Sequence, residues 1–525
     1  MNKKTFFAVS VIVYLLIIWY HPYIKGISNP NERIRFFLVH AVVSRGELSV
    51  NHEIRKFGDT IDKAEVNGKY YCDKAPLISL INVPSYYLYY KLHNGNVTEK
   101  DSLYFLKATN QALFALMLFW LFFFYIRKHS KDEKLNLFFS AALIFATPIF
   151  SFSVAYFSHS VTASLIFLFF VLLEKEIESP RFIWGYGAGF VGGLAVLNEY
   201  TSVPFLVVFS FFALIRMRKN PSSIIYFILG GMIPAFGLAI FNNAQFGSPF
   251  TLGYSHLSDK TFAVAQSKGL WGITFPSWKA FYETLFSIRI GALTLSPFLI
   301  LSGIGFYYSL KKRDLSLIGA AAAIAAHFYA VISYSVWDGG GTFGSRHFVP
   351  VIPLLMVLSV KGTLCVKEQL PMVLTFFKVT ALSSFLLFAG TVVNFSFFAP
   401  LFSNPLPNFT LIMIREGFYP SGSVASLLGI KGGLSFFLWM MLCFLIAIYT
   451  LYKSSNENKG VADFVSNILL AFGILSLYFI PYSGNSKQLN DAYMSMQKEI
   501  KNQDWRLKEL LMDGNYKDVI KQLDL

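Results

Sequence analysis

Ionisable residues that could act on a charged substrate lie beside several apolar stretches of this chain. The stretch "NGKYYCDKAPL" (67–77) places Asp73 and Lys74 immediately before an apolar run. A carboxylate can take a proton from a hydroxyl as a general base. A cation can bind phosphate and stabilise the charge that develops on it when it leaves. This pairing therefore predicts a site for group transfer from a lipid phosphate at a membrane surface.

Further ionisable residues are predicted on the same side of the membrane. They are Glu32, Arg35, Asp59 and Asp62, His159 in "SHS", Glu199 in "NEY", Arg289, and Asp338, Arg346 and His347 in "WDGGGTFGSRHFVP" (337–350). Ionisable residues near a bilayer are costly, so several on one side indicate a site. Each has a structural alternative: the cations could reach lipid headgroups, Glu199 could cap a helix, and His159 could be a structural hydrogen-bonding group.

The elements that would hold these residues are transmembrane helices. Of the 525 residues, 54% are hydrophobic and 14% are charged, whereas soluble domains carry about 25% charged residues. The net charge of +15 arises mostly in short loops between apolar runs, where basic residues set membrane orientation. No nucleic-acid partner is predicted. The three cysteines, Cys72, Cys365 and Cys443, fit neither a disulfide framework nor a zinc site.

Spans of about 20 apolar residues are needed to cross a bilayer. Candidate segments are 5–20, 76–91, 103–126, 136–150, 154–173, 182–197, 200–215, 222–242, 291–310, 315–335, 348–360, 371–397, 434–452 and 463–482. The segment 76–91 is short and contains Pro84, so the fold class predicted is an all-α polytopic membrane protein of about thirteen spanning helices. The first segment is expected to be retained as a helix rather than cleaved as a signal.

Basic loops predict the orientation, with the N-terminus in the cytoplasm. The loops 21–75, 243–290, 336–347 and 398–433 are then extracytoplasmic, as is the polar tail 483–525, which follows a membrane domain over 1–482. Within the first loop, "NERIRFFLVHAVVSRG" (31–46) places Ile34, Phe37, Leu38 and Ala41 at helical spacing. This spacing predicts an amphipathic helix on the membrane surface.

The order of these motifs resembles GT-C membrane glycosyltransferases, in particular the protein O-mannosyltransferase and lipid A aminoarabinose transferase group. In that group an Asp-Glu pair opens the first outer loop, and a Tyr-x-Asp-Lys-Pro-Pro-Leu motif closes it. Residues 71–77 are similar to the second motif, with Ala75 in place of the first proline, and Asn31-Glu32 is similar to the first. Residues 62–76, 246–254 and 340–353 are closer still to a bacterial branch of such proteins, so the resemblance extends to about residue 435.

The resemblance implies an inverting glycosyltransferase that uses a polyprenyl-phosphate sugar. Because Asn31 replaces the family's usual base, the catalytic carboxylate is expected to be Glu32, Asp62 or Asp73. Lys74 would contact the donor phosphate, and charge and position suggest Arg346 as a second contact. The remaining residues expected to bind substrate are Arg35, Tyr71, His159, Glu199, Arg289 and His347.

Three functions stay open at this point. The first is transfer of a sugar to a lipid, glycan or protein acceptor at the outer face of a bacterial cytoplasmic membrane. The second is a transporter or flippase of a lipid-linked glycan, which would require polar residues at the membrane midplane and similar halves; the charges here crowd one face. The third is a non-catalytic glycolipid-binding relative. No cofactor beyond the lipid-linked sugar is predicted, and a divalent metal among the outer carboxylates is not expected.

Overall fold

The computed structural model describes residues 1–21, 29–391, 404–411, 414, 419, 422–454 and 461–480. The predicted polar tail 483–525 lies outside these residues, as do residues 398–403, 412–413, 415–418 and 420–421 of the predicted outer loop 398–433.

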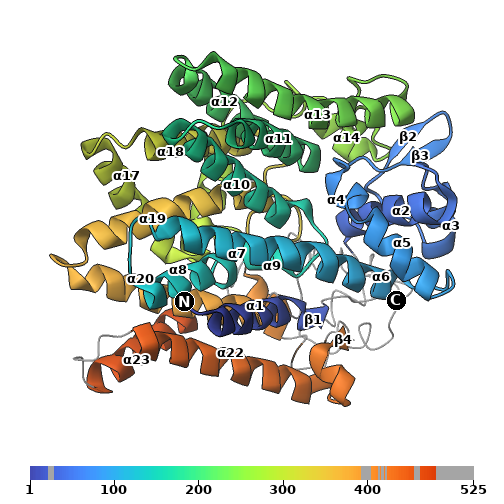
Figure 1. The fold of residues 1–525 in the computed structure, drawn as a ribbon. Coiled ribbons are helices and arrows are strands. Elements are labelled where there is room, and N and C mark those ends of the chain that lie inside the picture. Colours follow the sequence, from blue (N-terminus) through green and yellow to red (C-terminus); the bar gives the residue numbers. More distant parts are fainter. Residues whose placement is uncertain are drawn as a thin grey trace.

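Helices dominate the described chain (Figure 1). The N-terminal elements are α1 (Lys3–Ile18), β1 (Tyr20–His21), α2 (Pro30–Arg45), α3 (Asn51–Phe57), β2 (Ala64–Val66), β3 (Lys69–Tyr71), α4 (Leu77–Leu80), α5 (Val83–Leu92), α6 (Glu99–Leu106) and α7 (Ala112–Ile126). The central elements are α8 (Glu133–Phe145), α9 (Ile149–Ser153), α10 (Ser158–Glu178), α11 (Phe182–Asn198), α12 (Val203–Met217), α13 (Pro221–Phe246), α14 (Lys260–Gln266) and α15 (Trp278–Phe286). The C-terminal elements are α16 (Ala292–Leu295), α17 (Ser302–Lys311), α18 (Leu315–Ser333), α19 (Ile352–Val366), α20 (Pro371–Thr391), β4 (Gly422–Ser423), α22 (Gly432–Ser454) and α23 (Val461–Leu477).

The all-α polytopic prediction is confirmed. Seven helical segments among the described residues are long and apolar enough to cross a membrane: Glu99–Ile126, Tyr200–Met217, Pro221–Phe246, Leu315–Ser333, Arg346–Val366, Pro371–Thr391 and Gly432–Tyr449. Shorter apolar helices lie at Phe182–Asn198 and Phe464–Leu477. The predicted count of about thirteen spans is not reached by these continuous helices.

Two of the predicted spans are broken helices. The predicted span 76–91 divides into α4 and α5 at Asn82, one residue before the helix that carries Pro84 at its start. The predicted span 136–150 ends at Phe145 and resumes as α9 after Pro148. Proline has no N–H to continue a helical hydrogen-bond ladder, so each break has a local cause.

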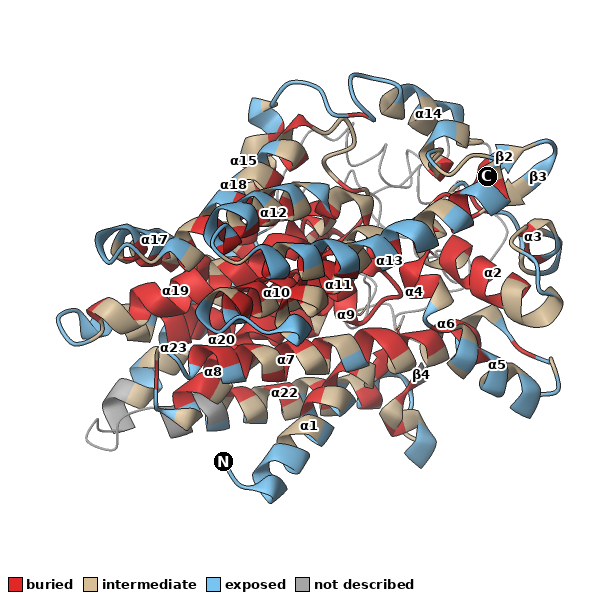
Figure 2. Ribbon diagram, turned by 45° about the horizontal axis from the view of Figure 1, so that its top comes forward, coloured by how far each residue is buried: buried red, intermediate tan, exposed pale blue. Residues whose placement is uncertain are grey.

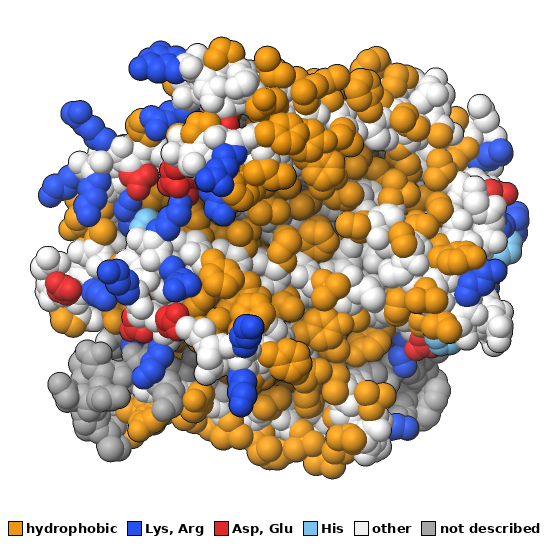
Figure 3. Space-filling view, viewed as in Figure 1, with side chains coloured by type: hydrophobic (Ala, Val, Ile, Leu, Met, Phe, Trp, Pro, Cys, Tyr) orange, Lys and Arg blue, Asp and Glu red, His pale blue; other side chains and the backbone are white. Residues whose placement is uncertain are grey.

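The helices pack in layers, with short helices and a hairpin gathered at one end (Figure 1). Helices α10 to α13 form one layer, α7, α8, α19 and α20 lie beneath it, and α22 with α23 cover the opposite side. The buried core follows α7, α10, α19 and α20 (Figure 2). Elements α2 to α5 and β2–β3 gather beyond the ends of these helices, on the right of Figure 1. In Figure 3 a broad apolar surface separates this region from a cluster of Lys and Arg on the left.

Helix α2 forms where the sequence predicted a helix, but it is not an amphipathic surface helix. Its eight consecutive residues 34–41 are all buried, because α3, α4, α5 and α6 pack around it. The polar residues on its other faces are therefore paired inside the protein rather than exposed to headgroups. Asn29 caps its start by accepting the N–H of Asn31, and Gly46 ends it in the left-handed conformation.

A buried ion cluster fixes α2 to α3. Glu53 Oε1 lies 2.8 Å from His40 Nδ1 and 2.5 Å from Arg45 Nη1. Burial alone would raise the pKa of Glu53, but the hydrogen bonds from His40 and Arg45 outweigh burial and hold it at about 2. The charged carboxylate therefore stabilises the fold at neutral pH.

We expect Glu53→Gln to remove part of the acid sensitivity of the protein. Because the folded pKa of about 2 lies below the ordinary value of 4.5, the carboxylate stabilises the fold above pH 4.5, and this contribution is lost as the pH falls from 4.5 toward 2. The variant should have a lower Tm at pH 7 and a shallower fall in Tm on acidification. Thermal unfolding in detergent across this pH range tests this, and parallel Tm curves for variant and wild type would contradict it.

A two-residue antiparallel pair joins the residues after α1 to the segment before α22. Tyr20 and His21 of β1 pair with Ser423 and Gly422 of β4. The Tyr20 hydroxyl also donates to Ser435 Oγ at 3.0 Å. The first helix is thus held in place by the segment that leads into α22.

Candidate active site

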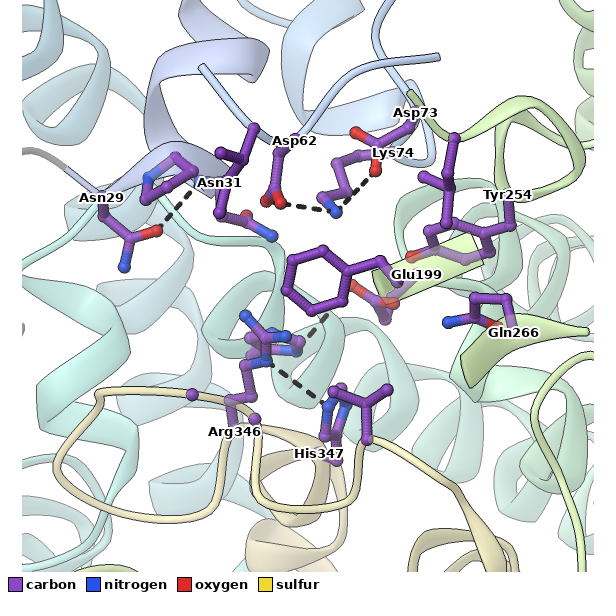
Figure 4. A pocket seen from close by; sticks show the side chains of 18 of the residues that line it. Asn29, Asn31, Asp62, Asp73, Lys74, Glu199, Tyr254, Gln266, Arg346 and His347 are labelled. Carbon is purple, nitrogen blue, oxygen red and sulfur yellow. Dashed lines mark hydrogen bonds and ion pairs between the residues drawn. The ribbon is translucent and has the colours of Figure 1, made fainter. Parts of the chain in front are cut away.

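A cavity of about 330 Å³ is lined in part by residues of the first loop, at the end of the bundle where α2 to α5 and β2–β3 gather, called the polar end below; Figure 4 shows it from close by. It is formed where the first loop meets the start of α10, the turn after α11, the segment 254–266 and the segment 334–347. Its polar and charged lining residues are Asn29, Asn31, Arg35, Asp62, Asp73, Lys74, His159, Glu199, Tyr254, Gln266, Tyr334, Asp338, Arg346 and His347. Eight of the predicted site residues are thereby brought together: Arg35, Asp62, Asp73, Lys74, His159, Glu199, Arg346 and His347.

Lys74 is the centre of one wall. Its Nζ lies 2.7 Å from Asp73 Oδ2 and 3.2 Å from Asp62 Oδ2, and it stands 5.6 Å from the centre of the Tyr254 ring. Burial would lower the pKa of Lys74, but the charges of Asp62 and Asp73 raise it instead. The side chain is therefore a fixed ammonium group.

A close approach of two loops builds this wall. A Cβ on Gly253 would lie 2.7 Å from the Cα of Asp73, so only glycine permits the contact. The same segment is tied to the first loop by the bridge between Ala64 and Leu257 and by the Ser258 N–H, which donates to the Lys63 carbonyl at 3.0 Å. The "FGSPF-x-x-GY" stretch of the sequence thus positions Tyr254 beside Lys74.

Arg35 and Glu199 form the floor of the cavity. Arg35 Nε donates to Asn31 Oδ1 at 3.0 Å, and its Nη atoms donate to the Ala75 carbonyl at 3.1 Å and Ser158 Oγ at 3.0 Å. The Ser158 hydroxyl donates in turn to Glu199 Oε2 at 2.5 Å. Arg35 is 1% exposed, and its donors are occupied by protein acceptors. It therefore organises the floor.

Arg346 faces Lys74 from the opposite wall (Figure 4). Its Nε contacts His347 Nε2 at 3.4 Å, and among the described residues it forms no ion pair with a carboxylate. Its charge is close enough to oppose the rise in the pKa of Lys74. Two cations on facing walls, one of them without an acidic partner in the described chain, favour an anion between them.

Two imidazoles lie at the base of Arg346. The rings of His159 and His347 meet edge to face with centroids 5.8 Å apart, and His159 Nδ1 lies 3.8 Å from Glu199 Oε2. His327 holds the segment from behind, because its Nε2 lies 2.6 Å from the His347 carbonyl oxygen. These contacts set the position of the Arg346 backbone.

Three predicted site residues do not line the cavity. Glu32 points away from it and accepts the N–H of Tyr156 at 2.6 Å; burial raises the pKa of this carboxyl to about 7. Tyr71 pairs with Ala64 in the β2–β3 hairpin and packs on Phe246. Arg289 donates to the Gly340 carbonyl at 2.9 Å and lies 3.9 Å from Asp338, so it supports the glycine-rich loop from outside.

Sequence reasoning did not identify the uncharged lining residues Asn29, Gln266 and Tyr334, and it considered Asn31 only as a replacement in a motif. Asn29 and Asn31 carry a recognisable signal, because they flank the proline at the start of α2. Gln266 and Tyr334 carry none, because they meet only through the fold, where Gln266 Nε2 donates to the Tyr334 hydroxyl. Together they give the cavity the amide and hydroxyl groups that suit a sugar.

Among the described residues, no three or more His, Cys, Asp or Glu side chains are grouped so that they could hold a metal ion. The space between Asp62 and Asp73, where such an ion would be sought, contains the ammonium of Lys74. The cavity thus joins a cationic pair, carboxylates and neutral hydrogen-bonding groups in one place. This set can bind a phosphate, orient a polar ring and accept a proton.

Comparison with known proteins gives matches at the level of structure. No protein-family model matches the chain. No curated protein matches it. ArnT from Cupriavidus metallidurans bound to undecaprenyl phosphate is 14% identical over 94% of this chain and 88% of its own, with a TM-score of 0.44; the apo form gives 13% identity over 91% and 73%, with a TM-score of 0.47.

Two larger proteins also match. The arabinosyltransferase EmbB from Mycobacterium smegmatis is 11% identical over 96% of this chain and 42% of its own, with a TM-score of 0.45. The archaeal oligosaccharyltransferase AglB from Archaeoglobus fulgidus is 12% identical over 96% and 60%, with a TM-score of 0.37. Such distant matches carry no information about the reaction of this chain. These solved structures are GT-C glycosyltransferases.

Proposed function

We propose that the protein is an inverting glycosyltransferase that moves a sugar from a polyprenyl phosphate to a hydroxyl of a lipid, glycan or protein. The observation that carries the proposal is the pair of facing cations, Lys74 and Arg346, with the Asp62 carboxylate in the same cavity. A phosphate between the two cations would be held by charge-assisted hydrogen bonds.

The bond changes follow from this placement. Asp62 takes the proton of the acceptor hydroxyl, whose oxygen attacks the anomeric carbon of the donor sugar. The bond from that carbon to the phosphate oxygen breaks, and its electron pair stays on the phosphate. Lys74 and Arg346 stabilise the added negative charge. Attack from the side opposite the phosphate inverts the anomeric configuration.

The other lining residues divide between the donor and the scaffold. Asn29, Asn31 and Gln266 provide hydrogen bonds for sugar hydroxyls, and the Tyr254 ring provides a flat apolar face for the sugar ring. Arg35 and Glu199 keep these groups in place through Ser158. His159 and His347 complete the cavity below Arg346.

We further propose that the cavity opens at the outer face of a bacterial cytoplasmic membrane. Lys and Arg side chains cluster on the left of Figure 3, the side where α17 lies in Figure 1. Basic residues follow α7, α12 and α17 in the sequence, and basic loops favour the cytoplasm. The N-terminus would then be cytoplasmic and the first loop extracytoplasmic. A lipid-linked donor could reach the cavity from the outer leaflet without a nucleotide.

A non-catalytic glycolipid-binding relative is the second candidate. Asn31 faces the cavity at the position where the motif of the resembling group has Asp, and its side chain accepts a hydrogen bond from Arg35. A transporter is less well supported, because the charged lining residues lie at one end of the bundle rather than at its middle (Figure 1).

The test is transfer from a panel of radiolabelled polyprenyl-phosphate monosaccharides by purified protein in lipid nanodiscs. An enzyme should convert one donor to a glycosylated acceptor, or release free polyprenyl phosphate. Tight binding of a donor without turnover would indicate a non-catalytic glycolipid-binding protein. Movement of the lipid between leaflets without bond cleavage would support a transporter.

We expect Arg346→Ala to weaken donor use by about 10- to 100-fold in kcat/KM, because one charged hydrogen bond to phosphate contributes about 1.5–3 kcal/mol. Arg346→Lys should restore part of the loss, since it keeps the charge but not the planar guanidinium. Arg313→Ala is the matched control, because Arg313 is exposed in the basic turn after α17. Unchanged transfer by Arg346→Ala would remove this residue from the phosphate site.

A further inference from the structure

Helix α15 exposes its aromatic residues and buries its small ones. Trp278, Tyr282 and Phe286 recur every fourth residue, so they lie on one face, and they are 76%, 53% and 43% exposed. Ala280 and Thr284 are fully buried on the other side. A helix in water would place these residues the other way round, so the exposed face of α15 is suited to an apolar surrounding.

The same surface continues into the segment before the helix. Leu270, Trp271 and Phe275 are 65%, 61% and 89% exposed. We call the six residues Leu270, Trp271, Phe275, Trp278, Tyr282 and Phe286 the aromatic ridge. A group of six large, exposed apolar residues within one segment indicates contact with a membrane or a partner.

The ridge begins where a membrane span ends. The N–H groups of Thr274 and Ser277 donate to the carbonyls of Ser333 and Ile332, at 2.8 and 2.9 Å, in the last turn of α18. Phe281, on the inner side of α15, packs on Phe328, which lies about one helical turn before Ile332 in α18. Helix α18 is a candidate span with only 33% of its apolar window buried inside the protein, so the ridge is continuous with a lipid-facing surface.

We propose that the aromatic ridge is embedded in the membrane, at the boundary between lipid headgroups and acyl chains. Trp and Tyr prefer this boundary, because their rings are apolar and each carries one polar group. Lys279 lies exposed beside Trp278, where its amine can reach a phosphate headgroup. The occupant of this surface is thus phospholipid, and continuity with the lipid-facing side of α18 argues against a soluble partner.

The ridge is rigidly connected to the candidate active site. The N–H of Ser335 donates to the Gly272 carbonyl, and its hydroxyl donates to the Ala265 carbonyl, both at 2.8 Å. Ala265 belongs to α14, whose Phe262 and Gln266 line the cavity. The depth of the ridge in the bilayer therefore sets the height of one cavity wall. If the proposed function holds, this places the donor phosphate at the headgroup level.

The test places a fluorophore on the ridge. Tyr282→Cys is labelled with an environment-sensitive nitrobenzoxadiazole, after replacement of Cys365 alone, because Cys72 and Cys443 are buried. Lys69→Cys is the matched control, since it lies exposed in the β2–β3 hairpin of the same polar end. Each protein is reconstituted in nanodiscs that contain phosphatidylcholine spin-labelled near the headgroup, and iodide is the aqueous quencher.

We expect the label at position 282 to be quenched several-fold more by the spin-labelled lipid than the label at position 69, with the reverse order for iodide. Equal iodide quenching at both positions would overturn the proposal. Protection of position 282 from both quenchers would also overturn it, and would indicate a protein partner or a second copy on the ridge. This measurement needs no sugar transfer, so its failure is distinct from failure of the proposed function.

A second variant connects the ridge to activity. Trp278→Asp with Tyr282→Asp should raise KM several-fold for a donor embedded in the bilayer, while kcat/KM for a short-chain, water-soluble polyprenyl-phosphate sugar stays near the wild-type value. Equal losses with both donors would show that the ridge acts through folding alone, and would contradict its role at the membrane.

Discussion

Replacing Asp62 with Asn is expected to lower the turnover number by about 10²- to 10⁴-fold, the usual contribution of a general base. The amide keeps the size of the side chain but cannot accept a proton. Lys74 remains held by Asp73 at 2.7 Å, so the phosphate site should survive. The KM for the donor should therefore change much less than the turnover number, as measured with a saturating lipid-linked donor in nanodiscs.

Glu32→Gln is the matched control for this prediction. Glu32 was one of the predicted catalytic carboxylates, and it stands next to Asn31 in the motif. Its carboxyl, however, accepts the Tyr156 N–H and does not line the cavity. A glutamine oxygen can accept the same hydrogen bond, so we expect transfer within about tenfold of wild type. If Asp62→Asn keeps near-normal turnover while Glu32→Gln is inactive, the proposed assignment of the base is wrong.

The second large effect concerns the fold. Gly189→Leu should prevent α11 from packing on α13, because a Cβ at position 189 would lie 1.8 Å from the carbonyl oxygen of Phe227. Gly230 makes the reciprocal contact, where a Cβ would lie 2.0 Å from the Tyr186 carbonyl oxygen. Small residues allow such close approach of membrane helices. The obstacle is backbone rather than a movable side chain, so the cost should exceed the ~1–3 kcal/mol typical of overpacking.

We expect this variant to be recovered poorly, and to unfold well below the wild-type temperature or elute as aggregate in detergent. Gly237→Leu is the control, because it lies on the same helix as Gly230 with nothing within 4 Å of a Cβ. It should behave as wild type. A monodisperse Gly189→Leu protein with an unchanged Tm would show that α11 and α13 pack less closely than described.

The sequence was informative where a signal is local. Apolar length predicted the helical membrane fold, and the Asp73-Lys74 pair before an apolar run predicted the wall of the cavity. The sequence was misleading where a residue's role depends on which face of a helix it occupies. Asn31 and Glu32 are neighbours in sequence, but successive residues on a helix point about 100° apart, so one lines the cavity and the other accepts a backbone N–H behind it.

Burial of α2 could not be read from its own sequence either. Arg35 and His40 are polar residues of this predicted surface helix, but both are 1% exposed and are paired with residues distant in the chain or in the next helix. Only tertiary contacts show whether a polar side chain meets solvent or a partner. The same holds for Gln266 and Tyr334, which are ordinary residues in sequence and become a cavity wall only through folding.

The pairing of β1 with β4 has a consequence for biosynthesis. The Tyr20 hydroxyl finds its acceptor in Ser435, 415 residues later, and a ribosome adds about 5–20 residues per second. The C-terminal end of the first helix must therefore wait on the order of 20 to 80 s before this partner is made. A chain released before residue 422 would lack β4 and leave Tyr20 and His21 without their strand partner.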